Sequence, residues 1–214
     1  MQGISMAKIE KPYPSIRLFK SDFMEYFSHV HPITPLLLWS PIIAYFFYRA
    51  FAGTLPAWVI GSWAALGLFA WTLAEYLLHR FIFHLPAQSV AGERFIYILH
   101  GLHHADAVDP TRLVLPPFPA VCFSVVLYAI FYALLGAVHV APFFGGFLVG
   151  YLCYDYIHYS VHHFTPRTKI GKMLKQSHMT HHFVSPNARW GVSSPLWDYV
   201  FGTLEAAEQI RHGS

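Results

Sequence analysis

Histidine is the residue type whose number and spacing in this chain could do chemistry. The sequence holds 15 histidines, against 14 lysines and arginines together. Ten of the histidines form four groups in short stretches: His79 and His84; His100, His103 and His104; His158 and His162; and His178, His181 and His182. Neutral imidazole binds Zn, Cu, Fe and Ni. Because ten imidazoles exceed the ordinary coordination number of one metal ion, the groups predict a site for two.

The spacing within the groups favours helices. Residues three and four apart lie on one face of an α-helix, so we expect each HX2HH group, and His158 with His162, to present its imidazoles together. His79 and His84 are five residues apart, which fits a helix end better than a regular face. His163 is rotated by about 100° from His162 on a helix, and we expect it not to bind metal. For a single group, ordinary surface or core histidines would be the better interpretation.

Two acidic residues stand close to the histidine groups. Glu75 is four residues before His79, and Asp155 is three residues before His158. Metal-binding histidines usually give their other N–H to a carboxylate or a carbonyl, and an unpaired charge near an apolar helix is costly. We therefore expect both carboxylates to support the site without binding metal. The alternative for each is a carboxylate at the membrane interface, in contact with water.

The composition indicates that the elements holding these residues lie in a membrane. Only 12% of the 214 residues are charged, against roughly 25% in a typical soluble domain, and 55% are apolar. Disordered chains are poor in apolar residues, so disorder is excluded as well. The small net charge of +3 does not suggest a nucleic-acid partner. The two cysteines, Cys122 and Cys153, lie in apolar runs and indicate no disulfide framework.

Four apolar runs predict an all-α integral membrane protein with four transmembrane helices in two hairpins. The first run is long enough to cross a hydrocarbon layer of ~30 Å at ~1.5 Å per residue. Short breaks at Gly53–Pro56 and His139–Ala141 separate the helices of each hairpin. Because the fourth run is short, buried helices of a soluble protein are the alternative. The runs are Ile33–Phe51, Ala57–Leu78, Phe118–Val138 and Pro142–Ile157.

The charges predict the orientation. Of the 14 lysines and arginines, 13 lie in residues 1–32, 79–117 and 158–214, and Arg49 is the exception. The positive-inside rule places these segments in the cytoplasm. All four histidine groups lie in them or at helix ends that face them, as one site requires. We expect 79–117 and 158–214 to form a helical cap over the bundle, with 1–32 as a cytoplasmic segment before a catalytic domain at 33–214.

A histidine-rich site for two metal ions at a membrane surface suggests oxidation of a lipid. Attack on an unactivated C–H bond needs a metal or another cofactor that handles O2. The sequence has no Gly-rich phosphate loop, no CxxC and no Gly-x-Ser-x-Gly elbow. Nucleotide, thiol-redox and serine-hydrolase chemistry therefore lack support.

The order of the motifs HX4H, HX2HH, HX3H and HX2HH resembles the membrane fatty acid hydroxylase and sterol desaturase superfamily. The stretches LHGLHH, DPTRLVLPPFPA, GYLCYDYIHYSVHH and GVSSPLWDYVFGTL are similar to fatty acid 2-hydroxylases, over about residues 20–205. The resemblance implies a four-helix scaffold with a cytoplasmic cap and the ten histidines as metal ligands. It also implies use of O2 and two electrons to hydroxylate the carbon next to the acyl carboxyl of a fatty acid or ceramide.

Some features depart from that family. Eukaryotic members carry an N-terminal cytochrome b5 domain, which 32 residues cannot hold. We therefore expect a separate electron donor, cytochrome b5-like or ferredoxin-like, and a bacterial inner membrane rather than the endoplasmic reticulum. His163 stands where an apolar or aromatic residue is expected. Iron is the expected metal for O2 chemistry, and zinc could replace it in purified protein.

Two other functions stay open at this point. One is a different hydroxylase or desaturase of the same superfamily, acting on a sterol, a carotenoid or a lipid headgroup. The other is a polytopic metal transporter. A transporter should place its ligands near the middle of the bilayer, whereas these histidines are expected at one side.

Overall fold

The computed structural model describes residues 15–204, and this part of the chain is helical, with no strand. Its elements, in order, are α1 Asp22–Ser28, α2 Thr34–Phe51, α3 Ala57–Leu78, the π-helix η1 His79–Phe83, α4 Val90–Ile96, the π-helix η2 Tyr97–Gly101, α5 Leu102–Ala105, α6 Pro117–His163, α7 Lys169–Phe183 and α8 Leu196–Val200.

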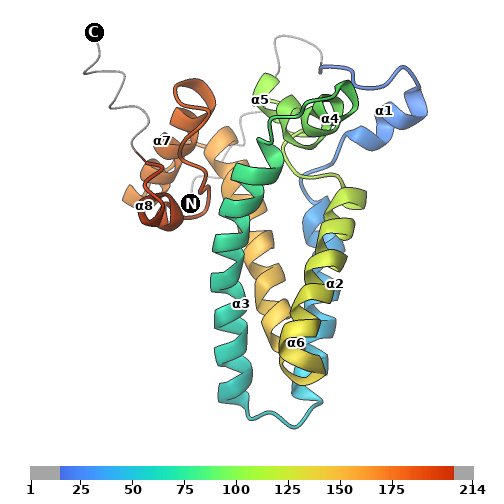
Figure 1. Cartoon of the computed structure of the whole chain (residues 1–214), viewed down its shortest axis with the longest axis vertical. Helices are drawn as coiled ribbons and strands as arrows, with labels where there is room; N and C mark the ends of the chain where they lie inside the picture. The colour runs from blue at the N-terminus through green and yellow to red at the C-terminus, as the bar shows by residue number, and fades with distance from the viewer. Residues whose placement is uncertain (1–14, 205–214) are drawn as a thin grey trace, which may run out of the picture.

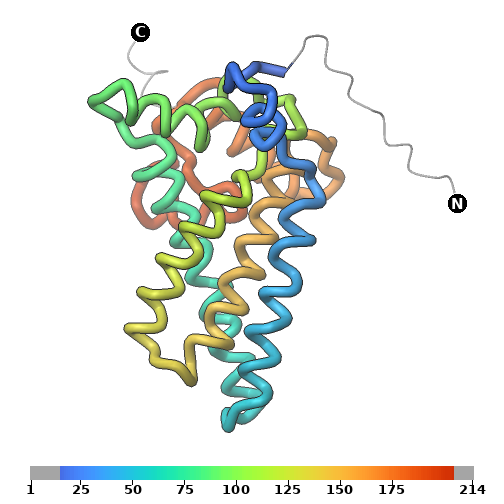
Figure 2. Tube along the Cα trace, turned by 90° about the vertical axis from the view of Figure 1, so that its right-hand side faces the viewer, coloured from blue at the N-terminus to red at the C-terminus, as the bar shows by residue number. Residues whose placement is uncertain are grey.

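Helices α2, α3 and α6 form an elongated bundle, and α6 folds back on itself (Figures 1 and 2). The reversal is at Gly136, whose φ of 69° and ψ of 172° interrupt the helix. A positive φ costs glycine little, because it has no Cβ. The predicted outer turn at His139–Ala141 is therefore wrong, since these residues are helical. The other break, Gly53–Pro56, separates α2 from α3 as predicted.

Two helical stretches in the described part of the chain are long and apolar enough to cross a membrane. They are Ala57–Phe83, with a mean hydropathy of 1.5, and Pro117–His163, with 2.4. Large apolar side chains point outward along both, including Trp58, Val125 and Leu134. A surface of this kind is suited to lipid rather than to water.

The core of the bundle is aromatic, and two glycines let its helices approach closely. Trp71 of α3 packs on Phe147 and Tyr151 of α6, with ring centroids 5.2 and 5.0 Å apart. A Cβ at Gly67 would lie 1.9 Å from the carbonyl oxygen of Phe143 in α6, and one at Gly146 equally close to the backbone of α3. Small residues at such crossings are typical of helices that pack in membranes.

The shorter helices gather at one end of the bundle, where α3 ends and the second limb of α6 ends (Figure 1). A nearly buried ion pair ties α1 to the segment that precedes α6. The guanidinium of Arg112 lies 2.5 Å from Oε1 of Glu25 and donates to the carbonyl of Ser28 at 2.9 Å. The arginine of the RLVLPP stretch therefore holds α1 to the segment between α5 and α6.

Candidate metal centre

The ten histidines converge where the bundle meets the short helices, and they form two groups of five. Within each group, one atom per ring lies within 4.8 Å of the corresponding atom of every other ring. We call them the first and the second histidine group. The first comprises His79, His84, His100, His104 and His181, and the second comprises His103, His158, His162, His178 and His182.

The nitrogen separations fit shared metal ions. In the first group, Nε2 of His100 lies 3.0 Å from Nε2 of both His79 and His104. In the second, Nε2 of His178 lies 2.8 Å from that of His162 and 3.1 Å from that of His182. Two nitrogens each ~2.1 Å from one ion and at right angles are ~3 Å apart. The donor set therefore suits one ion in each group.

Two further imidazole nitrogens have no hydrogen bond that would explain their burial. Nε2 of His84 and Nε2 of His181 are buried and have no hydrogen-bond partner among residues 15–204. A buried polar atom without a partner is costly. Both atoms belong to rings of the first histidine group, where a metal ion would give each lone pair a partner.

Each HX2HH motif divides its histidines between the two groups. The first and last members go to one group and the middle member, His103 or His181, goes to the other. The expectation that one helix face presents all three together is therefore wrong. Positions i+3 and i+4 differ by about 100° around the axis, so each motif straddles the boundary. At that boundary the rings of His104 and His182 stack 4.0 Å apart.

The spacing of His79 and His84 is explained by a π-helix. Residues His79–Phe83 form the π-helix η1, and its i→i+5 hydrogen bonds widen the turn. Residues five apart then lie on the same side, and these two rings have centroids 5.1 Å apart. The sequence indicated a helix end here, and η1 is the last turn of the helix that begins as α3.

His163 lies outside both groups. Its ring packs on Tyr159 with centroids 4.5 Å apart, and the centroid of His162 is 6.4 Å away. That the residue does not bind metal stays a prediction.

Burial keeps the histidines of the cap neutral. It lowers the pKa of His84 and of His181 to about 4. The pKa values of His100, His103 and His178 are held well below the usual value, first by burial and then by neighbouring imidazoles. Neutral imidazole is the form that binds metal, so at pH 7 these rings need not lose a proton first.

Backbone carbonyls of one loop orient two of the rings. Nδ1–H of His79 donates to the carbonyl of Trp190 at 2.5 Å, and Nδ1–H of His181 donates to the carbonyl of Ala188 at 2.7 Å. Each bond leaves Nε2 with its lone pair directed at the first histidine group. Such partners fix the tautomer and direction of a ligand.

Two buried carboxylates hold that loop in place. Glu75 accepts from the amides of Val192 at 2.6 Å and Ser193 at 2.8 Å, so it supports the loop rather than His79 directly. Asp198 accepts from the amides of Trp190 at 2.8 Å and Gly191 at 2.7 Å. Asp198 is not among the site residues expected from the sequence, although it is the one charged residue in the apolar stretch SSPLWDYVFG.

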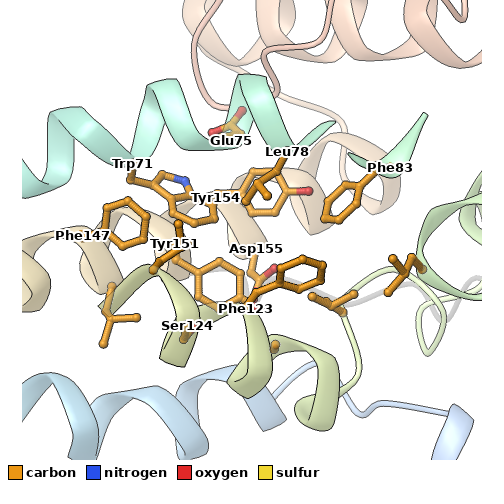
Figure 3. A pocket seen from close by; sticks show the side chains of 15 residues that line it. Trp71, Glu75, Leu78, Phe83, Phe123, Ser124, Phe147, Tyr151, Tyr154 and Asp155 are labelled. Atoms are coloured by element: carbon orange, nitrogen blue, oxygen red, sulfur yellow. The ribbon is translucent and has the colours of Figure 1, made fainter. Parts of the chain in front are cut away.

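Asp155 lies in the wall of an apolar pocket beside the histidines (Figure 3). It is buried, and its Oδ2 has no hydrogen-bond partner in the described part of the chain. The pocket is open at one side, and most of the side chains that line it are apolar or aromatic. Phe83 in its wall stacks on His100 at 5.4 Å, and Tyr154 lies 5.5 Å from His158. Side chains of the pocket wall therefore contact a ring of each histidine group.

Comparison with known proteins gives one consistent result. A model of the fatty acid hydroxylase family matches residues 64–203. A dihydroceramide fatty acyl 2-hydroxylase of Arabidopsis thaliana is 37% identical over 188 residues, which are 88% of this chain and 79% of that protein. The fatty acid 2-hydroxylase of Homo sapiens is 34% identical, over 88% of this chain and 56% of its own length.

A solved structure extends the similarity to three dimensions. It is titled full-length scs7p with only the hydroxylase domain visible, and it is 32% identical. The TM-score is 0.81, over 86% of this chain and 72% of that one.

Proposed function

This chain belongs to the fatty acid hydroxylase family, and on that premise we propose that it hydroxylates carbon 2 of a long-chain fatty acyl group, free or in the amide of a ceramide. It is a membrane-bound oxidoreductase of that family. The observation that carries the proposal is the meeting of two five-histidine groups with one apolar pocket.

The proposed arrangement in the membrane has four spans. They are α2, α3 and the two limbs of α6 on either side of Gly136. The histidine groups then lie at the cytoplasmic side, which is supported by the ten lysines and arginines in residues 15–32, 79–117 and 158–204 at that end. A metal transporter is disfavoured, because the histidines gather at one end of the bundle rather than at its middle.

The ten histidines would hold two metal ions, five ligands to each. The proposed metal is iron, because zinc has no redox chemistry. When bound, the ions supply the activation of O2 that attack on a C–H bond requires. The proposed source of the two electrons is a cytochrome b5-like or ferredoxin-like carrier. The chain's own part is to hold neutral imidazoles in place through the carbonyls of Trp190 and Ala188.

The pocket is the proposed site of the acyl chain. Its aromatic and aliphatic walls exclude water, and two side chains of the wall, Phe83 and Tyr154, contact histidine rings. Asp155 brings a carboxylate into this wall without a partner for Oδ2 among residues 15–204. We propose that it supports the centre without binding metal.

Lipid mass spectrometry of cells with and without the chain tests this function. Cells that lack their own 2-hydroxylase should accumulate 2-hydroxy acyl lipids when the chain is expressed, and His104→Ala at matched level should accumulate none. A hydroxylated sterol, carotenoid or headgroup in place of 2-hydroxy acyl chains would overturn the substrate assignment. Lipids unchanged by the chain would overturn the enzyme itself.

A further inference from the structure

Helix α8 does not sit on top of the bundle but beside α3, below its end (Figure 1). The indole N–H of Trp197 donates to the hydroxyl of Thr72 at 2.9 Å, and the ring of Trp197 lies 5.7 Å from that of Phe69. The ring of Phe201, directly after α8, stacks on Tyr76 at 5.2 Å. These contacts fix the level of α8 along α3.

That level is well inside the length of a membrane span. Phe69 is nine residues before the end of α3 at Leu78, which is ~13 Å at ~1.5 Å per residue. Helix α3 has 22 residues and is ~33 Å long, close to the ~30 Å of a hydrocarbon layer. The side chain of Trp197 therefore reaches into the layer that α3 crosses.

The polarity of α8 is the reverse of that of a helix on a water-facing surface. Its one charged residue, Asp198, is 0% exposed, and both of its carboxylate oxygens accept hydrogen bonds from the loop between α7 and α8. Its outward side chains are apolar or aromatic: Tyr199 is 78% exposed, Val200 is 54% exposed and the following Phe201 is 50% exposed. Water would disfavour this arrangement, and lipid favours it.

We propose that α8 and Phe201 are immersed in the cytoplasmic leaflet and contact lipid there. The cap is then held both by its contacts with the bundle and by insertion of α8 into the bilayer. Lipid is the occupant, because the exposed face continues the apolar surface of α3. Leu66, Leu68 and Phe69 of α3 are half exposed at or just below the same level, where a water-soluble partner cannot reach.

The consequence concerns the metal centre. Asp198 of α8 holds the amides of Trp190 and Gly191, and the carbonyl of Trp190 orients His79. A lipid-embedded helix thus stabilises the loop whose Trp190 carbonyl orients His79 in the first histidine group. The inference rests on the proposed spanning of α3 and not on the reaction, so it can fail while the hydroxylase assignment stands.

Spin labelling in bilayers tests the depth of α8 directly. The full chain, with Cys122 and Cys153 replaced by alanine, receives a single label at Tyr199→Cys or at Val200→Cys. It is reconstituted in phosphatidylcholine bilayers with added phosphatidylglycerol. Collision rates with O2, which concentrates in lipid, and with a water-soluble nickel chelate are compared. Leu66→Cys on α3 is the lipid-facing control, and the exposed Lys172→Cys on α7 is the water-facing control.

The expected result is that labels at 199 and 200 behave like the label at 66, open to O2 and shielded from the nickel chelate. Access to nickel as at 172 would overturn the proposal. Shielding from both reagents would also overturn it, because it would mean that protein, such as a second copy of the chain, covers α8. Circular dichroism and retained metal in each labelled variant show that the label reports on the folded protein.

Discussion

His181 is the middle histidine of its motif and the one that crosses to the other group. It stands in the first histidine group with four residues from other helices, while its motif partners His178 and His182 stand in the second. Replacing His181 by alanine should abolish hydroxylation, because the first group loses a donor whose N–H is anchored on Ala188. His163→Ala should keep most of the activity, because that ring lies outside both groups.

The measurement is the yield of 2-hydroxy lipid in cells that express each variant at matched level. Equal loss in both variants would mean that His163 contributes to the centre after all. His181 and His163 differ only in their position within their motifs, so one variant is the test and the other is its control.

Asp155 tests a second residue-level claim. Replacement by asparagine keeps the shape of this buried side chain and replaces its carboxyl group next to the pocket by an amide. We expect metal retention or turnover to fall by about 10-fold, the low end of what outer partners of metal sites usually cost. Metal analysis and turnover of purified, membrane-inserted protein decide it. If both values match those of the unsubstituted chain, Asp155 is only part of the pocket wall.

At this scale the sequence predicts which histidines gather, because four motifs of regular spacing leave little choice. It does not predict their partition, which depends on how each helix is rotated. Nor does it predict the bonds from His79 to Trp190 or from Glu75 to Val192, whose partners are more than 100 positions apart. Such contacts depend on the tertiary fold, and no local sequence pattern predicts them.

Helices α3 and α6 cross at glycines, which makes their packing sensitive to one methyl group. A Cβ at Gly67 or Gly146 would lie 1.9 Å from a backbone carbonyl of the facing helix. Gly67→Ala and Gly146→Ala should each destabilise the fold by about 1–3 kcal/mol, as overpacking does. Thermal unfolding in detergent measures the change.

Gly61→Ala is the matched control in α3, since a Cβ there meets no atom of the described residues within 4 Å. It should leave the unfolding temperature unchanged or raise it slightly, because alanine is the better helix former. A drop for Gly61→Ala as large as that for Gly67→Ala would contradict the close-crossing explanation.

The loop between α7 and α8 depends on Asp198. Asparagine has one acceptor oxygen where aspartate has two, so Asp198→Asn should leave one of the amides of Trp190 and Gly191 without its acceptor. The cost should be about 1–3 kcal/mol, the usual penalty for a buried unpaired donor. We expect faster hydrogen exchange at the unpaired amide and weaker metal retention. Asp22→Asn is the control, because Asp22 is exposed and pairs only with Arg17 among the residues described. Unaltered exchange at Trp190 and Gly191 would refute this role.

Among the elements, α2 and α3 are predicted almost to the residue, because apolar runs bounded by Gly53 and Pro56 leave few other ends. The turn in α6 is misplaced, because the run from Phe118 onward is apolar throughout. Both Gly136 and the His139–Ala141 link are possible positions for the turn, and only the backbone conformation shows that the chain reverses at Gly136. The five-residue spacing of His79 and His84 indicates a helix end, and the structure shows that this end is the π-helix η1.

For the whole molecule, topology explains why four distant motifs form one centre. Each hairpin leaves from and returns to the same end of the bundle, so residues 79–104 and 158–182 meet there (Figure 1). The short outer turns carry no histidine motif. Long helices of the bundle thus provide most of the apolar pocket, and the ten imidazoles meet at the end of the bundle where the short helices gather.

The most direct test of the central claim uses heavy-isotope O2. The purified chain in bilayers is given a dihydroceramide, a one-electron donor and labelled O2, and the product is fragmented in a mass spectrometer. We predict one labelled oxygen per product molecule, located on carbon 2 of the acyl chain. Oxygen derived from water, or a hydroxyl placed on the sphingoid base or on another acyl carbon, would contradict the account.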